Sequence, residues 1–292
     1  LSNFSSVNKF ERTYNGSVVS EDAPTGFQEA PMSPEISKRV VGLEDGKLVI
    51  REDYLSQQPE TTGTESVTDA SDPAINYDGT ALACLGDTGR SLYFFSGGKG
   101  QYLVKNKKMT APSFDSFGWL WVAESDGAVR AYNAASTNEK ERSKGIEIPV
   151  SWRSGMTFSS LRISHDGARV VVVGTRDGTA AVVMSGVVRD SSGTPKGFTE
   201  PVRVTSSITP RTAVWAGEQN LVVVNDKTGE SEVTTLSGEE TKFDRLDGVK
   251  SVSAAGNTSN MLAHRSDGSC YVLEERGWNR LNTSTREMSF AG

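Results

Sequence analysis

Cysteine and histidine are the scarcest residues in this sequence, with two of each among 292 residues. Cys84 and Cys270 each lie in an apolar, strand-like run, so we predict two buried thiols instead of a disulfide framework. His165 falls in a predicted turn and His264 at the end of a predicted strand, and no nucleophile elbow flanks either one. The sequence therefore argues against a zinc centre and against a Ser-His-Asp triad.

Long apolar runs and large clusters of positive charge are missing as well. No window of 18 apolar residues exists, so no membrane-spanning helix is predicted. The net charge of −6 argues against nucleic acid or an anionic membrane surface as the main partner. No signal peptide is visible and the first residue is Leu1, so we expect a fragment of a longer protein whose targeting segment has been removed.

The sequence is rich in turn chemistry instead. The segment "ISHDGARVVVVGTRDGTAAVVM" (163–184) contains Asp-Gly twice, and a run of apolar, mostly β-branched residues follows each time. Asp-Gly favours tight turns, and such runs favour short strands. The second turn recurs at intervals of 38 to 51 residues, with its glycine at Gly46, Gly89, Gly127, Gly178, Gly229 and Gly268. A repeat of this length with several short strands is typical of a β-propeller.

Each repeat is predicted to contain four strands, numbered here from the first to the fourth. In the repeat quoted above, we expect them at 158–164, 169–174, 179–185 and 199–205. Two repeats are longer because they contain the polar insertions "NAASTNEKERSKG" and "VVRDSSGTPKG". We predict that both insertions are solvated hairpin loops.

The two ends of the sequence predict how the ring closes. The terminal "REMSFAG" has the pattern of a first strand, whereas "SKRVVGLEDGKLVIRED" has the pattern of second and third strands. Pairing these ends would remove two exposed sheet edges. The prediction is an all-β fold, a six-bladed β-propeller over residues 35–292, closed by the C-terminal strand pairing with the N-terminal half-blade. Residues 1–34 are predicted to be a linker or extended arm from an absent upstream domain.

Acidic residues recur in the turns between second and third strands, one in each repeat. They could mark a cation or ligand site, but Asp before Gly is also what a turn needs, and we interpret them as turn residues. No two carboxylates can be selected as an opposed glycosidase pair. "SFDSFGWLW" resembles the Asp-box of sialidase propellers, although two residues separate Asp115 from Gly118 instead of one. Such a box is structural, so we expect no enzyme, no metal and no cofactor.

A partner-binding surface is the remaining candidate. In propellers, the turns between second and third strands and the loops between blades usually form the functional face. Trp152 and Arg153 lie in one such loop, and an exposed Trp-Arg pair is typical of a binding hot spot. Packing of Trp152 in the core or the channel wall is the alternative. The predicted partner-binding residues are Asp126, Trp152, Arg153, Arg176, Asp177 and Arg265.

Two segments resemble the C-terminal β-propeller domain of actinobacterial LpqB-type lipoproteins. They are "APSFDSFGWLWVAESDG" and, roughly 50 residues later, "LRISHDGARVVVVG"; the terminal "SFAG" and "RVVGLEDGKLVI" are also similar. The resemblance covers about residues 36–292. It implies a protein outside the cytoplasmic membrane, anchored by a lipidated N-terminal cysteine that this sequence does not contain. It also implies association with the MtrA–MtrB two-component system, with the extracytoplasmic part of the sensor histidine kinase as partner.

Three functions from different classes are compatible with these observations. The leading hypothesis is a non-catalytic extracytoplasmic interaction module that modulates a sensor kinase in envelope and cell-division signalling. The alternative is a carbohydrate- or ligand-binding propeller at the cell wall, which would need exposed aromatic side chains and two opposed carboxylates at the channel mouth. A mouth lined by small or aliphatic residues would argue against it. The third hypothesis is a structural spacer that binds nothing.

Overall fold

The chain divides into two units, Leu1–Ile36 and Ser37–Gly292. The computed structural model describes residues 9–14, 17–22, 39–60, 65–255 and 260–291. In the first unit, β1 (Lys9–Tyr14) and β2 (Ser17–Asp22) form an antiparallel hairpin. The prediction of a linker or arm over 1–34 did not anticipate this hairpin. The remainder of that segment lies outside the described residues, and its origin in an upstream domain stays a prediction.

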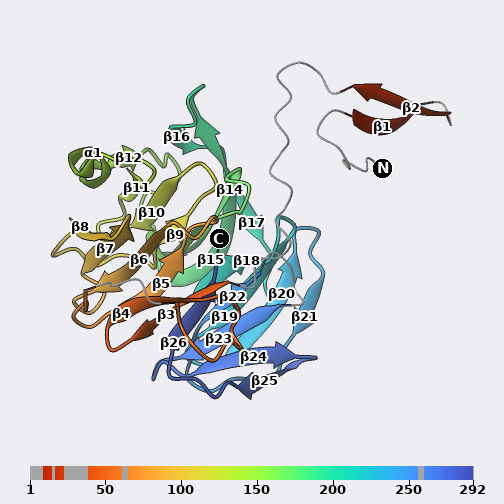
Figure 1. The fold of residues 1–292 in the computed structure, drawn as a ribbon. Coiled ribbons are helices and arrows are strands. Elements are labelled where there is room, and N and C mark those ends of the chain that lie inside the picture. Colours follow the sequence, from red (N-terminus) through yellow and green to blue (C-terminus); the bar gives the residue numbers. More distant parts are fainter. Residues whose placement is uncertain (1–8, 15–16, 23–38, 61–64, 256–259, 292) are drawn as a thin grey trace. The chain divides into compact units, whose positions relative to one another are not determined.

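The second unit is a six-bladed β-propeller whose sheets follow one another around a ring (Figure 1). Blade 1 contains β5 (Ser71–Ile75), β6 (Ala81–Gly86), β7 (Ser91–Ser96) and β8 (Lys99–Val104). Blade 2 contains β9 (Ser113–Phe114), β10 (Trp119–Ala123), β11 (Val129–Asn133) and β12 (Ile146–Ile148). Blade 3 contains β13 (Thr157–Ile163), β14 (Arg169–Arg176), β15 (Thr179–Arg189), β16 (Pro195–Phe198) and β17 (Val202–Val204).

The next two blades have four strands each, paired in chain order. Blade 4 contains β18 (Thr212–Trp215), β19 (Asn220–Asn225), β20 (Glu230–Thr235) and β21 (Glu240–Lys242). Blade 5 contains β22 (Val249–Ala254), β23 (Met261–Arg265), β24 (Cys270–Glu274) and β25 (Gly277–Arg280). The strands expected for blade 3 agree with β13, β14, β15 and β17 to within a few residues.

The last blade, called here the closing blade, joins the two ends of the ring. Its first strand is β26 (Arg286–Phe290), which pairs with β3 (Val40–Glu44), and β3 pairs with β4 (Lys47–Arg51). A single bridge between Ile50 and Glu60 stands where a fourth strand would pair. The predicted closure by the C-terminal strand is therefore confirmed.

Both polar insertions differ from the solvated loops that the sequence predicted. The first contains the helix α1 (Glu139–Lys144), which begins at Asn138 because its side chain accepts two backbone N–H groups of the first turn. The second contains β16, which pairs with an extension of β15 (Val187 opposite Phe198). Val187 and Val188 are β-branched residues at the start of the insertion, and such residues favour strands. The strand β15 therefore extends into the insertion. Within the described residues, no helix is long and apolar enough to cross a membrane.

Six apolar clusters hold the ring together, one at each interface between neighbouring blades. The second strands are buried on both sides, which explains the unbroken valines Val170–Val173 of β14, all 0% exposed. Cys84 and Cys270 are buried and free, as predicted. Burial, followed by the charges of Asp72 and Glu287, raises the pKa of Cys84 to about 12.

Candidate functional site

The recurrent Asp-Gly turns are built as turns. All six turn glycines have φ between 75° and 88°, a region that glycine enters without a Cβ clash. Asp126 accepts the backbone N–H of Ala128 at 2.8 Å, and Asp267 accepts that of Ser269 at 2.9 Å. These contacts support the interpretation of the recurrent carboxylates as turn residues. The side of the ring that carries these turns, and the loops that lead into each first strand, is called here the turn face.

Five of the six predicted partner-binding residues lie together on the turn face. Arg153 donates from Nη1 to the backbone oxygen of Asp126 at 3.4 Å, which joins the loop before β13 to the turn of blade 2. Arg176 donates from Nη2 to the backbone oxygen of Trp152 at 2.9 Å, which joins the same loop to the turn of blade 3. Asp177 follows Arg176 and is exposed. Two neighbouring blades therefore share one hydrogen-bonded surface.

Trp152 is half-buried and packs inward. Its ring lies 6.1 Å from that of Phe158 and 6.3 Å from that of Phe198, between centroids. Its indole Nε1 donates to the backbone oxygen of Thr199 at 3.1 Å. Trp152 is therefore packed in part against the blade core, and its role in partner binding stays a prediction.

Arg265 is the sixth predicted residue, and it lies apart from the other five, in blade 5. Its guanidinium donates to the hydroxyl of Tyr271 at 3.0 Å, and this hydrogen bond lowers the pKa of Tyr271. Blade 5 is two blades further along the ring than blade 3. The six residues therefore do not form one continuous site.

A cavity of about 600 Å³, called here the mouth cavity, lies on the turn face where the first strands begin. A narrower inner cavity of about 70 Å³ continues between the first strands. Arg162 and Ser251 border both cavities, so they lie where the wide part meets the narrow part.

Half of the side chains in the wall of the mouth cavity are small or carry a hydroxyl group, and most of the others are charged. Phe158 is the one aromatic residue among the described residues that line it, and it packs against Trp152. The two carboxylates in the wall are each in an ion pair, Asp72 with Lys250 at 3.4 Å and Asp226 with Arg211 at 3.2 Å. This wall argues against the glycan-binding alternative.

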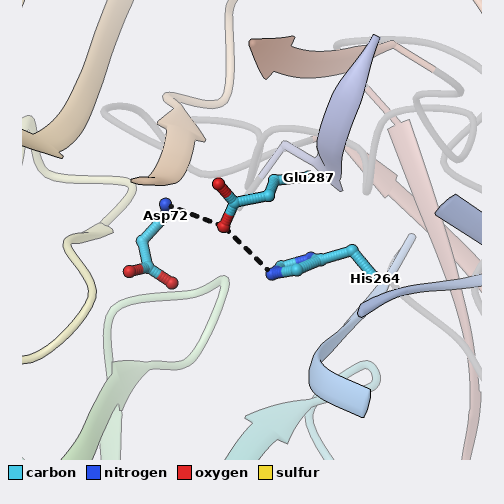
Figure 2. Close-up of side chains that lie close together, drawn as sticks. All are labelled: Asp72, His264 and Glu287. Atoms are coloured by element: carbon cyan, nitrogen blue, oxygen red, sulfur yellow. Dashed lines mark hydrogen bonds and ion pairs between the residues drawn. The ribbon is translucent and has the colours of Figure 1, made fainter. Parts of the chain in front are cut away.

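Beside the mouth cavity, residues of three blades meet in a charged cluster (Figure 2). Asp72 comes from β5, His264 from β23 and Glu287 from β26, and their potential ligand atoms lie within 4.8 Å of one another. Glu287 Oε1 is 3.4 Å from His264 Nε2 and accepts the backbone N–H of Asp72 at 3.3 Å. The ammonium of Lys250 on β22 is 3.0 Å from Glu287 Oε1 and 3.4 Å from Asp72 Oδ2.

Backbone irregularities direct these side chains. Asp72 and Glu287 both adopt positive φ, 52° in each case, and the strand register shifts at Asp72, Lys250 and Glu287. A β-bulge changes the direction in which a side chain points. The same kind of irregularity at the start of three first strands therefore brings the cluster together at the channel.

The electrostatics of the cluster are those of a closed ion network. Burial raises the pKa of Glu287, but the hydrogen bond and charge of His264 and those of Lys250 outweigh it and hold that pKa at about 2. Burial lowers the pKa of Lys250, but the charges of Asp72 and Glu287 outweigh it and the pKa is raised. The general acid of a glycosidase needs a raised pKa, whereas the pKa of Glu287 is lowered. Glu287 therefore does not suit that role.

One histidine and two carboxylates form a set that could hold a divalent cation. The Lys250 ammonium already forms an ion pair with each of the two carboxylates, so it takes the place next to them that a cation would fill. The network also links blade 1, blade 5 and the closing blade, which are the blades where the ring closes. The geometry of this network therefore fits a structural role, in which the ion pairs stabilise the closed ring of blades. This cluster was not predicted from the sequence because its members come from three different repeats. The available signal was the shared position of Asp72, Lys250 and Glu287 at the start of first strands.

Asp115, in the segment that resembles an Asp-box, has a structural role. Its Oδ1 accepts the backbone N–H groups of Phe117 and Trp119 at 2.8 and 2.9 Å. Its Oδ2 accepts the indole N–H of Trp121 at 2.8 Å and forms an ion pair with Arg189, also at 2.8 Å. Because both carboxylate oxygens of Asp115 are engaged in these contacts, Asp115 stabilises the turn against its blade. It is not available as a catalytic acid or base.

Comparisons with known proteins agree with this geometry. A family model described as the lipoprotein LpqB β-propeller domain matches residues 46–288. The lipoprotein LpqB of Streptomyces avermitilis is 26% identical over 171 residues, which cover 53% of this chain and 27% of that protein. The match thus spans about a quarter of that relative's length.

Solved structures are similar in fold. A chain of a nidogen/laminin complex has a TM-score of 0.61 at 10% identity, with 87% of this chain and 98% of that chain covered. TolB from Acinetobacter baumannii has a TM-score of 0.60 at 16% identity, with 88% and 67% covered. Hsv2 from Kluyveromyces lactis has a TM-score of 0.52 at 10% identity, with 82% and 71% covered. At these identities the likeness shows the propeller fold alone.

Proposed function

The chain belongs to the family of the lipoprotein LpqB β-propeller domain, and on that premise we propose that it is a non-catalytic, extracytoplasmic protein-interaction module. Membership in a lipoprotein family supports a location outside the cytoplasmic membrane, with membrane contact only through an N-terminal lipid anchor of the whole protein. We propose that its partner is the extracytoplasmic domain of a sensor histidine kinase. Docking would then modulate a two-component system in envelope and cell-division signalling.

The observation that carries the docking function is the pre-organised surface on the turn face. The hydrogen bonds from Arg153 to Asp126 and from Arg176 to Trp152 fix loops of two blades against each other. A surface that is already ordered loses less conformational entropy when a partner binds. The charged groups of Arg176 and Asp177 are exposed on it. This surface is our proposed docking site, with Arg265 as a separate contact.

The channel gives a catalytic function little support. Both carboxylates of the mouth cavity are held in ion pairs, and the half-buried Asp72 shares one lysine with the buried Glu287. A glycan-active propeller would need one carboxyl group that can donate a proton and an aromatic platform for the sugar. The interaction module therefore remains the one function that we propose.

Binding calorimetry with the extracytoplasmic segment of the cognate sensor kinase tests the proposal. We expect saturable binding that Arg176→Glu combined with Arg265→Glu weakens by about tenfold or more. Arg203→Glu is the control, because Arg203 is exposed on β17, in the outer part of blade 3.

The outcomes separate the function from its location. Binding that ignores the double reversal keeps the interaction module and moves the docking site elsewhere on the ring. Absence of binding at about 100 µM, which corresponds to a free energy weaker than about −5.5 kcal/mol, would contradict the proposed partner.

A further inference from the structure

Arg162 occupies an unusual position in the channel. It lies on β13, borders both the mouth cavity and the inner cavity, and donates from Nη1 to the backbone oxygen of Pro112 at 3.2 Å. Among the residues that the structure describes, no carboxylate forms an ion pair with it. A guanidinium carries five N–H donors, and the bond to Pro112 is the one hydrogen bond that this side chain makes to the described residues.

The chain treats its other enclosed arginines differently. Arg189 pairs with Asp115 at 2.8 Å, and Arg51 pairs with Glu44 at 3.0 Å. Burial lowers the pKa of Arg162, and the charge of Asp72 opposes this shift only in part. Arg162 is half-buried, and a partly desolvated charge without an acidic partner is stabilised when a ligand supplies the counter-charge.

The mouth cavity as a whole has a surplus of positive charge. The basic side chains in its wall are Lys108, Arg162, Arg211 and Lys250, whereas the acidic ones are Asp72 and Asp226. Both acidic groups are already in ion pairs, with Lys250 and Arg211. Lys108 and Arg162 therefore remain available to an anion, in a chain whose net charge is −6.

The shape and lining of the cavity indicate which anion fits. The mouth cavity of about 600 Å³ has the size of a site for a short peptide or a drug-sized ligand, whereas the inner cavity of about 70 Å³ has space for a small group only. Hydroxyl groups such as those of Thr157 and Thr212 line the wall and can bond a peptide backbone. The planar guanidinium of Arg162 matches a carboxylate in bidentate geometry.

We propose that the mouth cavity binds an extended acidic peptide segment whose carboxylate pairs with Arg162, while Lys108 attracts the segment at the rim. This inference rests on the proposed docking function, and it specifies the chemistry that the partner presents. A peptide is favoured over a nucleotide or a sugar because the lining offers hydroxyl groups and a single aromatic side chain.

The test uses two synthetic hexapeptides with fluorescein at the amino end, and measures binding by fluorescence anisotropy. The acidic probe is Ser-Gly-Ser-Gly-Glu-Asp with a free carboxyl end, and its neutral counterpart is Ser-Gly-Ser-Gly-Gln-Asn with an amidated end. We expect the protein to bind the acidic probe at least about tenfold more tightly, with affinity falling as salt is added. Equal affinities for the two probes would overturn the proposal.

Three variants locate the site. Arg162→Met removes the charge at similar volume, and we expect it to weaken binding of the acidic probe at least about tenfold. Lys108→Glu changes an exposed side chain, so it tests the cavity even if Arg162→Met fails to fold, and we expect a loss of about threefold or more. Lys140→Glu on α1, which makes the same charge change away from the channel, should leave binding unchanged. A loss of binding in Lys140→Glu as large as that in Lys108→Glu would overturn the location.

Two further arms separate the possible explanations. Succinate as competitor identifies a free small acid: displacement of the probe by succinate at equal concentration would overturn the peptide assignment. The sensor-kinase segment is titrated in parallel. Probe binding without kinase binding would keep this site and contradict the proposed partner. Kinase binding that is unchanged in both Arg162→Met and Lys108→Glu would keep the docking function and overturn this site.

Discussion

The two walls of the channel treat charge in opposite ways. On the wall where the ring closes, Lys250 contacts both Asp72 and Glu287, and His264 lies against Glu287. On the wall formed by β13, Arg162 contacts a backbone oxygen and no carboxylate of the described chain. Both basic residues lie on first strands and border the mouth cavity, and Arg162 also borders the inner cavity.

This difference separates the charges that hold the protein together from those that are available to a partner. The closing wall links β5, β22 and β26, so its ion network joins the first and last blades of the ring. Its charges compensate one another within the molecule. Arg162 is linked to blade 2 by a single hydrogen bond to the backbone oxygen of Pro112, so we expect its charge to contribute less to folding.

The largest expected effect follows from removing the cation of the closing wall. Lys250→Met would remove the ammonium that contacts both the half-buried Asp72 and the buried Glu287, and would leave His264 as the one basic group of the cluster beside them. We expect a loss of about 3–5 kcal/mol in the free energy of unfolding, measured by urea denaturation. A loss below about 1 kcal/mol would show that the network does not stabilise the closure.

The pH dependence of stability sharpens the same comparison. Glu287 titrates near 4.5 when unfolded and near 2 in the folded protein, so its contribution is complete above pH 4.5 and disappears as the pH falls through 2. The difference amounts to about 3 kcal/mol for this group. We expect Glu287→Gln to show a correspondingly smaller loss of stability between pH 4.5 and 2, measured by denaturation at each pH. Parallel curves for the two proteins would contradict this assignment.

The smallest expected effect on stability belongs to the other wall. Because Arg162 is half-buried and has no acidic partner among the described residues, Arg162→Met removes a partly desolvated charge together with a single hydrogen bond. We expect the free energy of unfolding to change by less than about 1 kcal/mol in either direction. A loss as large as that of Lys250→Met would mean that Arg162 is a structural residue, and the contrast between the walls would fail.

The ring itself could be predicted from the sequence because its signals are local. An Asp-Gly turn between two β-branched runs specifies a hairpin within about ten residues, and its recurrence specifies the blades. The incomplete patterns at the two ends were enough to predict that β26 pairs with β3. By contrast, α1 was missed because its only strong signal was the capping residue Asn138 in a polar insertion.

The candidate site could be predicted only in part. The contacts of Arg153 and Arg176 follow from two loops that the repeat placed on one face. The cluster around Glu287 could not be found, since Asp72, Lys250 and Glu287 meet only when the ring is closed. Arg162 lies in the segment "LRISHDG", which is part of the family resemblance. The local sequence does not show whether an arginine has an acidic partner. Pairing is a property of the assembled channel.

The central claim is that the turn face and its channel receive a partner. It is tested most directly by a calorimetric titration of the sensor-kinase segment into the wild-type protein and into Arg162→Met. We predict a dissociation constant below about 100 µM for the wild-type protein, and binding at least about tenfold weaker for a variant that unfolds at the same temperature. No saturable heat with the wild-type protein, or equal affinity for both proteins, would contradict the account.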